Sequence, residues 1–104
     1  MRQAEVIVDK QFAGILTEQN NKHYVFEYHD MYQGMPVSLT MPLAQKKFEY
    51  TRFPAFFDGL LPEGIMLSAL LKLDKLDAND YFGQLMAVGN DLVGNISVRE
   101  IKKT

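Results

Sequence analysis

Apolar and polar residues alternate along the first part of the chain, which is the pattern of half-buried β-strands. Residues 5–9 and 12–18 are rich in β-branched and aromatic side chains, as strands commonly are. The polar residues 9–11 between them predict a tight hairpin connection. The chain is therefore expected to open with a β-hairpin.

The alternation continues after the turn pair Asn20-Asn21. Tyr24, Phe26 and Tyr28 fall on one face of a third predicted strand, and that face should meet the core. Residues 37–41 alternate again and predict a fourth strand, bounded by a loop with glycine and proline before it and by a proline after it. Residues 43–53 show no clear period, so we expect an extended connection there. The four strands suggest an antiparallel meander.

Helix signals follow the predicted meander. Pro54 suits the first turn of a short helix and Gly59 its end, while Pro62 begins a second helix that runs to about residue 73. The middle of the chain is thus expected to change from strands to helices.

A third helix and a closing strand complete the pattern. Asp77 or Asn79 can cap this helix at its start, and Gly89 is expected to end it, because glycine tolerates the left-handed conformation. Ile96 and Val98 alternate with polar residues and predict the last strand. The predicted fold is α+β: a small antiparallel sheet of about five strands packed with two to three short helices.

In the helix predicted to begin at Pro62, Ile65 does not fit the pattern of apolar and polar positions. Five apolar side chains fall within an arc of about 160° and are expected to face the core: Met66, Leu67, Leu70, Leu71 and Leu73. Ile65 projects beside Lys72, on the opposite, polar side. Two interpretations are open. Single exposed apolar residues are common and need no explanation, or Ile65 is an anchor for another protein.

Composition narrows the classes of protein. With 104 residues, the chain fits a single domain spanning residues 1–104. Membrane insertion and secretion are not expected, since no apolar run approaches about 18 residues and no signal-peptide pattern is present. The chain has no cysteine, which excludes disulfides and thiolate metal sites and fits a cytoplasmic location. A net charge of −2 disfavours direct binding of nucleic acid.

The sequence contains no recognisable catalytic or metal-binding pattern. The spacing of Gly83, Gly89 and Gly94 matches no phosphate-binding loop, and the two histidines end one predicted strand, too far apart to share a metal. Asp74, Asp77 and Asp80 recur every three residues. They suggest helix capping rather than calcium binding, because the glycine and terminal glutamate of an EF-hand loop are lacking. We expect no cofactor, no metal and no enzymatic activity.

Two sequence blocks suggest a family. Residues 53–64 read FPAFFDGLLPEG and residues 79–89 read NDYFGQLMAVG. In this order and spacing they resemble the small N-terminal subdomain of HipA-type serine/threonine kinases, which are toxins of bacterial toxin–antitoxin systems. The resemblance covers about residues 5–98. That subdomain precedes the kinase machinery and holds none of it.

The resemblance also implies a role. Where the kinase is shorter, a separate small protein, HipS, restores this subdomain in trans and acts as the antitoxin. The implied partner is therefore a truncated HipA-like kinase of the HipT type, and a DNA-binding HipB-like protein would join only through the complex. The family often has polar or basic residues where Ile65 and Met66 stand. The residues expected to bind the partner are Asp58, Glu63, Gly64, Ile65, Met66 and Ala69.

Two alternatives remain open. The chain could be the structural N-terminal subdomain of a full-length HipA-like kinase, with no inhibitory role of its own, or a small enzyme acting alone. The charged residues 99–104, which follow the last predicted strand, are expected to be a natural chain end. That expectation favours the antitoxin.

Overall fold

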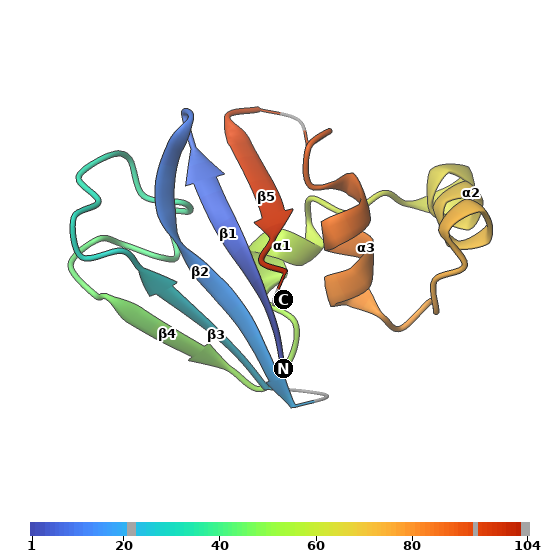
Figure 1. Ribbon diagram of the computed structural model, residues 1–104, viewed down its shortest axis with the longest axis horizontal. Coiled ribbons are helices and arrows are strands. Elements are labelled where there is room, and N and C mark those ends of the chain that lie inside the picture. Colours follow the sequence, from blue (N-terminus) through green and yellow to red (C-terminus); the bar gives the residue numbers. More distant parts are fainter. Residues whose placement is uncertain (21–22, 93, 103–104) are drawn as a thin grey trace.

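A five-stranded antiparallel sheet and three helices make up the computed structural model, which describes residues 1–20, 23–92 and 94–102 (Figure 1). The strand order is β4-β3-β2-β1-β5. The elements are β1 (Arg2–Val8), β2 (Gln11–Asn20), β3 (His23–Tyr28), β4 (Lys47–Tyr50), α1 (Ala55–Asp58), α2 (Gly64–Asp74), α3 (Tyr81–Val88) and β5 (Ile96–Glu100). The predicted α+β class is confirmed. The turn expected at Asn20-Asn21 and the chain end after residue 102 lie partly outside the described residues.

The opening hairpin has the turn that its sequence predicts. Val8 pairs with Gln11, so Asp9 and Lys10 form the whole connection, with φ of 50° and 68°. Two consecutive left-handed residues match the right-handed twist of the flanking strands. An aspartate tolerates this conformation better than most residues.

The fourth strand was placed wrongly by the sequence pattern. Residues 37–41 form turns, and β4 lies in the segment that was expected to be an extended connection. The Tyr28 hydroxyl accepts a hydrogen bond from the Val37 amide and donates one to the Met41 carbonyl. The side chains of Val37 and Met41, which belong to this irregular segment, are both buried. The alternation of residues 37–41 therefore reflects two buried side chains that hold a loop in place, and not a strand.

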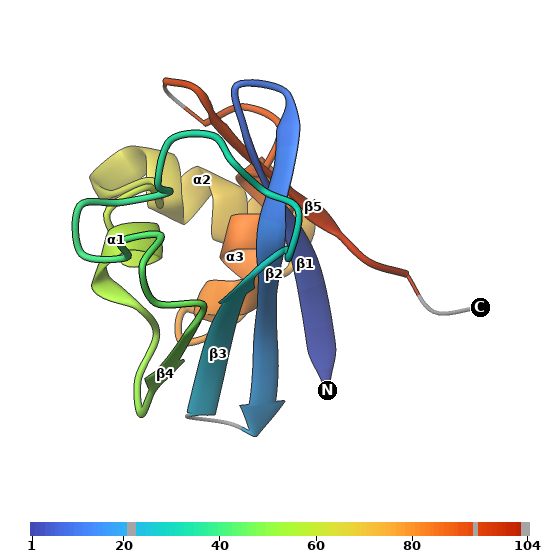
Figure 2. The same ribbon diagram turned by 90° about the vertical axis from the view of Figure 1, so that its left-hand side faces the viewer.

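The core lies on one face of the sheet. Figure 2 shows the helices on the same side of the strands, and cross-strand partners line that face. Most of the fully buried side chains of this core come from the strands and from α1 and α3: Ala4, Val6, Val8, Ala13, Leu16, Phe26, Phe57, Phe82, Leu85 and Val98. The two halves of the chain thus share one apolar core, to which α2 adds no buried residue.

The cap of α3 differs from the prediction. Asp80, and neither Asp77 nor Asn79, is the N-cap, and its carboxylate accepts a hydrogen bond of 3.0 Å from the Gly83 amide. The Asp77 carboxylate instead accepts from the Asn79 amide in the preceding turn. Both acidic groups thus satisfy local backbone donors, in line with the capping interpretation. Within the described residues, no group of three potential ligands is placed to hold a metal ion.

Gly89 ends α3 for a different reason from the one predicted. Its φ is −56°, a right-handed conformation open to any residue. However, a Cβ here would lie 2.0 Å from the Val98 carbonyl oxygen, and the Val98 amide donates to the Gly89 carbonyl at 3.0 Å. Close packing of α3 on β5 therefore requires the glycine.

In the part of the chain that is described, no helix is both long and apolar enough to cross a membrane.

Candidate interaction surface

Helix α2 stands apart from the sheet. Figure 1 shows it at one end of the molecule, beyond α3. None of its residues is buried, whereas the short α1 before it buries Phe57 completely. A helix rich in leucine with no buried side chain presents much of its apolar surface to solvent.

The turn before α2 sets its direction. Glu63 is the N-cap in an extended conformation, and Gly64 follows with a φ of +59°. A Cβ on Gly64 would meet nothing within 4 Å. Glycine is therefore needed here for its backbone conformation and not for lack of space.

The predicted core face of α2 was partly wrong. Leu67, Leu70 and Leu71 are half-buried and form the side turned toward the molecule. Met66 and Leu73 were expected in the core but are exposed. The reason is that α2 does not pack on the sheet, so only a narrow stripe of leucines is covered.

The exposed residues of α2 form a second apolar stripe. Ile65 is 86% exposed and Leu73 is 79% exposed. We call the following residues, which fall within an arc of about 100° on a helix, the α2 stripe: Ile65, Met66, Ala69 and Leu73. The outward orientation predicted for Ile65 is thus what the structure shows, but Ile65 is not alone.

Three of the predicted partner-binding residues belong to this stripe, namely Ile65, Met66 and Ala69. Leu73 was not among the predicted partner-binding residues. On the helix projection it falls in the arc that was expected to face the core and also in the arc that is exposed. Asp58 and Glu63 are exposed in the segments that lead into α2. The projection alone could not tell which arc of the helix is covered, since that depends on where α2 sits relative to the sheet.

The chain around the α2 stripe is acidic. Residues 55–80 contain five acidic and two basic side chains. The exposed acids are Asp58, Glu63, Asp74 and Asp77. Among the ion pairs formed by the described residues, none involves these four. The surface therefore combines apolar side chains with negative charge that is not paired by any cation among the described residues.

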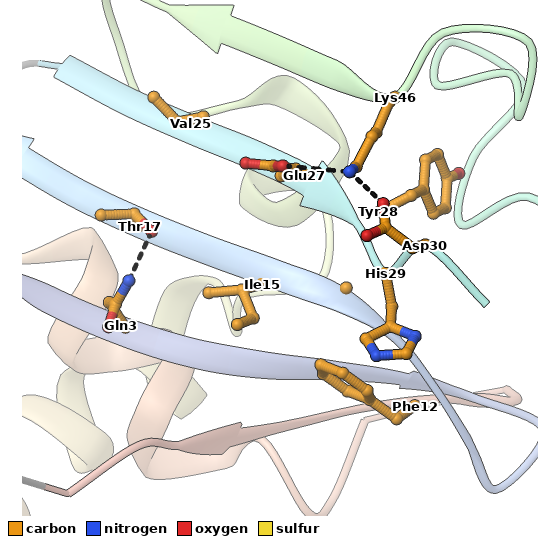
Figure 3. Close-up of a pocket in the computed structure, with 11 residues that line it drawn as sticks. Gln3, Phe12, Ile15, Thr17, Val25, Glu27, Tyr28, His29, Asp30 and Lys46 are labelled. Atoms are coloured by element: carbon orange, nitrogen blue, oxygen red, sulfur yellow. Dashed lines mark hydrogen bonds and ion pairs between the residues drawn. The ribbon is translucent and has the colours of Figure 1, made fainter. Parts of the chain in front are cut away.

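Two hollows elsewhere hold no catalytic arrangement. One, of about 270 Å³, lies on the sheet, and Figure 3 shows its polar side chains bonded to one another: Gln3 to Thr17, and Lys46 to Glu27 and Asp30. The hydrogen bond from Lys46 lowers the pKa of Asp30 and raises that of Lys46. A lowered pKa makes the Asp30 carboxylate a weaker base, and a raised pKa keeps Lys46 protonated, so neither group is suited to general-base catalysis.

The second hollow, of about 710 Å³, lies where the ends of β1 to β3 approach α3. Arg2 crosses it and pairs with Glu18 at 2.8 Å and with Asp80 at 2.7 Å. Its guanidinium also lies 5.0 Å from the centre of the Phe82 ring. These contacts tie β1 to α3, which is a structural role.

Comparison with known proteins gives consistent matches. The family model of the HipA N-terminal domain matches residues 4–99. A protein of Haemophilus influenzae described as uncharacterized is 29% identical over 103 residues, covering 99% of this chain and 96% of that protein. A solved structure, the N-terminal domain of HipA toxin, superposes with a TM-score of 0.79 at 27% identity, covering 100% of this chain and 96% of the other.

Proposed function

The chain belongs to the family of HipA N-terminal domains, and on that premise we propose that it is an antitoxin that binds a HipA-like serine/threonine kinase in trans and inhibits it. The matching domain is not the catalytic part of the kinase. A protein built from this domain would therefore act by binding. The proposed setting is a bacterial toxin–antitoxin system in the cytoplasm.

The observation that carries the proposal is the α2 stripe. Ile65 and Leu73 are large, exposed apolar side chains on a helix that stands clear of the core. Amphipathic helices of this kind bind by laying their apolar residues into a groove of a partner. Exposing such side chains to water costs free energy, so their burial against a partner is favoured.

The proposed mechanism is steric. Helix α2 docks at the cleft of the kinase, with Ile65 and Met66 projecting toward the active site and Ala69 and Leu73 filling the groove along the helix. Gly64 fixes the angle at which the helix enters. Kinase clefts bind anionic phosphates through basic groups.

The acidic side chains add a second contribution to docking. Asp58 and Glu63 form no ion pair with the cations of residues 1–20, 23–92 and 94–102. They are therefore available to pair with basic groups at the rim of the kinase cleft. A DNA-binding HipB-like protein would associate with the kinase, and this chain would reach DNA only through that complex.

The length of the Haemophilus influenzae relative supports a role in trans. The match spans 96% of the Haemophilus influenzae protein, so that relative has almost no sequence outside the shared domain. The alternative is a structural subdomain in cis, part of a longer kinase. The reading frame after residue 104 separates them: a stop codon followed by a separate kinase gene supports the antitoxin, and continuous reading into a kinase supports the alternative.

Titration calorimetry with the purified kinase tests the surface. Ile65→Glu and Leu73→Glu should each weaken binding by roughly 30-fold, which corresponds to a loss of about 2 kcal/mol for an apolar anchor. Leu39→Glu is the matched control, because Leu39 is equally large and exposed in another part of the chain. Full affinity in both α2 variants would refute the assignment of the stripe, while no binding by the wild-type chain would refute the pairing itself.

A further inference from the structure

The connection between β3 and β4 is a second exposed apolar region. Residues 31–45 contain no charged side chain, although 23% of the chain is charged. The charges that flank this segment, Asp30 and Lys46, form an ion pair with each other. The loop therefore presents an uncharged surface.

The loop is held in a fixed shape by tyrosines. The Tyr28 hydroxyl bonds to the backbone of Val37 and Met41, and the Tyr32 ring stacks on Tyr28 at 5.9 Å with an interplanar angle of 3°. The side chains of Val37 and Met41, two residues of the loop itself, are buried. Its exposed side chains are thus presented by an ordered backbone.

Apolar residues occupy turn corners of this loop, where polar residues, glycine and proline are usual. Leu39 is the second residue of a turn closed by the Met41 amide donating to the Ser38 carbonyl at 3.0 Å, and it is 96% exposed. The next turn, from Pro42 to Gln45, places Leu43 at the same position. We call the exposed apolar residues of this segment the loop patch: Met31, Met35, Leu39 and Leu43.

The loop patch and α2 lie far apart. Figure 1 shows the β3–β4 connection and α2 at opposite ends of the longest axis, along which the molecule extends 39 Å. One partner seated on the α2 stripe therefore leaves the loop patch free. Both surfaces can be occupied at once.

We propose that the loop patch is the interface through which two copies of this chain associate. In a two-fold dimer each surface meets the same surface of its copy, so a charged patch would face like charge. The loop patch carries none, and the two charges that flank its segment, Asp30 and Lys46, pair with each other. The surroundings of the α2 stripe differ, because the exposed acids there, which form no ion pair among the described residues, would repel a second copy and suit a basic partner instead.

The fixed shape of the loop favours association as well. Ordering a flexible segment on binding costs free energy, and a preorganised one avoids that cost. Methionine and leucine at the tips of the turns supply adaptable apolar contacts. The dimer is expected to form without the kinase.

Sedimentation velocity of the full chain over a range of concentrations tests this. The wild-type protein should shift from one chain of 11.9 kDa toward twice that mass as concentration rises. Leu39→Asp and Met35→Asp should each raise the dissociation constant of the dimer at least tenfold. Ile65→Asp is the control and should leave it unchanged. A circular dichroism melting curve equal to that of the wild type shows that each variant is folded.

Two results would overturn the proposal. One is a wild-type chain that stays monomeric at the highest concentration reached, and the other is a dimer that Leu39→Asp and Met35→Asp leave intact. If the chain is monomeric but Leu39→Asp weakens binding to the kinase, the loop patch belongs to the kinase interface and the second copy is excluded. Because the dimer is measured without kinase, its failure would leave the proposed function untouched.

Discussion

Arg2 is the residue that joins the first strand to the last helix. Its guanidinium bonds to Glu18 and Asp80 and lies over Phe82, so one side chain connects β1, β2 and α3. Its hydrogen bonds to the two carboxylates raise the pKa of Arg2, which keeps it charged. None of this could be predicted from the sequence, because 78 residues separate Arg2 from Asp80.

Replacing Arg2 by alanine should lower the free energy of unfolding by about 1–3 kcal/mol, because hydrogen bonds to charged groups are lost and two partly buried carboxylates remain. The matched control is Arg99→Ala, which breaks an exposed pair with Glu5 and should cost about 0–1 kcal/mol. Urea unfolding at neutral pH measures both. Equal losses in the two variants would contradict the structural role of Arg2.

The same contact predicts how stability depends on pH. The hydrogen bond from Arg2 lowers the pKa of Asp80 in the folded protein, while an unfolded aspartate has a pKa of about 3.9. This contribution is therefore fully present above the unfolded pKa and is lost as the pH falls through the folded pKa. Urea unfolding in the acid range should show a shallower pH dependence for Arg2→Ala than for the wild type. Identical slopes would contradict it.

Among the elements, alternation and helix signals predicted all but β4, and they misjudged the covered side of α2. β4 was missed because its alternation of polar and apolar residues runs over only four positions, while the buried Val37 and Met41 gave a loop segment the pattern of a strand. The covered side of α2 was misjudged because helix periodicity shows only that apolar arcs exist. Which arc is covered depends on the position of α2 beyond α3.

The junction of α3 and β5 gives an element-scale test. Gly89→Ala should destabilise the fold by about 1–3 kcal/mol, because the new Cβ would collide with the Val98 carbonyl 2.0 Å away. Gly59, which ends α1, is the matched control: its nearest atoms lie at 3.5 Å and its φ of −65° suits alanine. Thermal unfolding measures both variants. A Gly89→Ala protein as stable as the wild type would show that α3 and β5 are packed less closely.

At the scale of the whole molecule, the two ends differ in charge. Around α2 the exposed acids form no ion pair among the described residues, whereas residues 31–45 of the β3–β4 connection carry no charged side chain. This asymmetry separates a surface suited to a basic partner from a surface suited to its own copy. The sequence blocks pointed to the family, but the separation of these surfaces depends on the arrangement in space.

The charge at the α2 end predicts that salt weakens binding to the kinase. Acidic side chains steer a basic partner, and this effect falls as ionic strength rises. The association rate measured by stopped-flow should therefore decrease with salt, and Asp58→Asn with Glu63→Gln should flatten that dependence. Leu39→Asn is an uncharged control that should keep the wild-type dependence. An association rate independent of salt would contradict a basic rim on the kinase.

Inhibition of a HipA-like kinase through the α2 stripe, as proposed for this chain, can be measured directly. The most direct measurement is the rate at which the purified kinase phosphorylates its protein substrate while the chain is titrated in. We expect the wild-type chain and Leu39→Glu to abolish phosphorylation at saturation, whereas the double variant Ile65→Glu, Leu73→Glu should leave the rate close to that of the kinase alone. Undiminished inhibition by the double variant, or no inhibition by the wild-type chain, would contradict it.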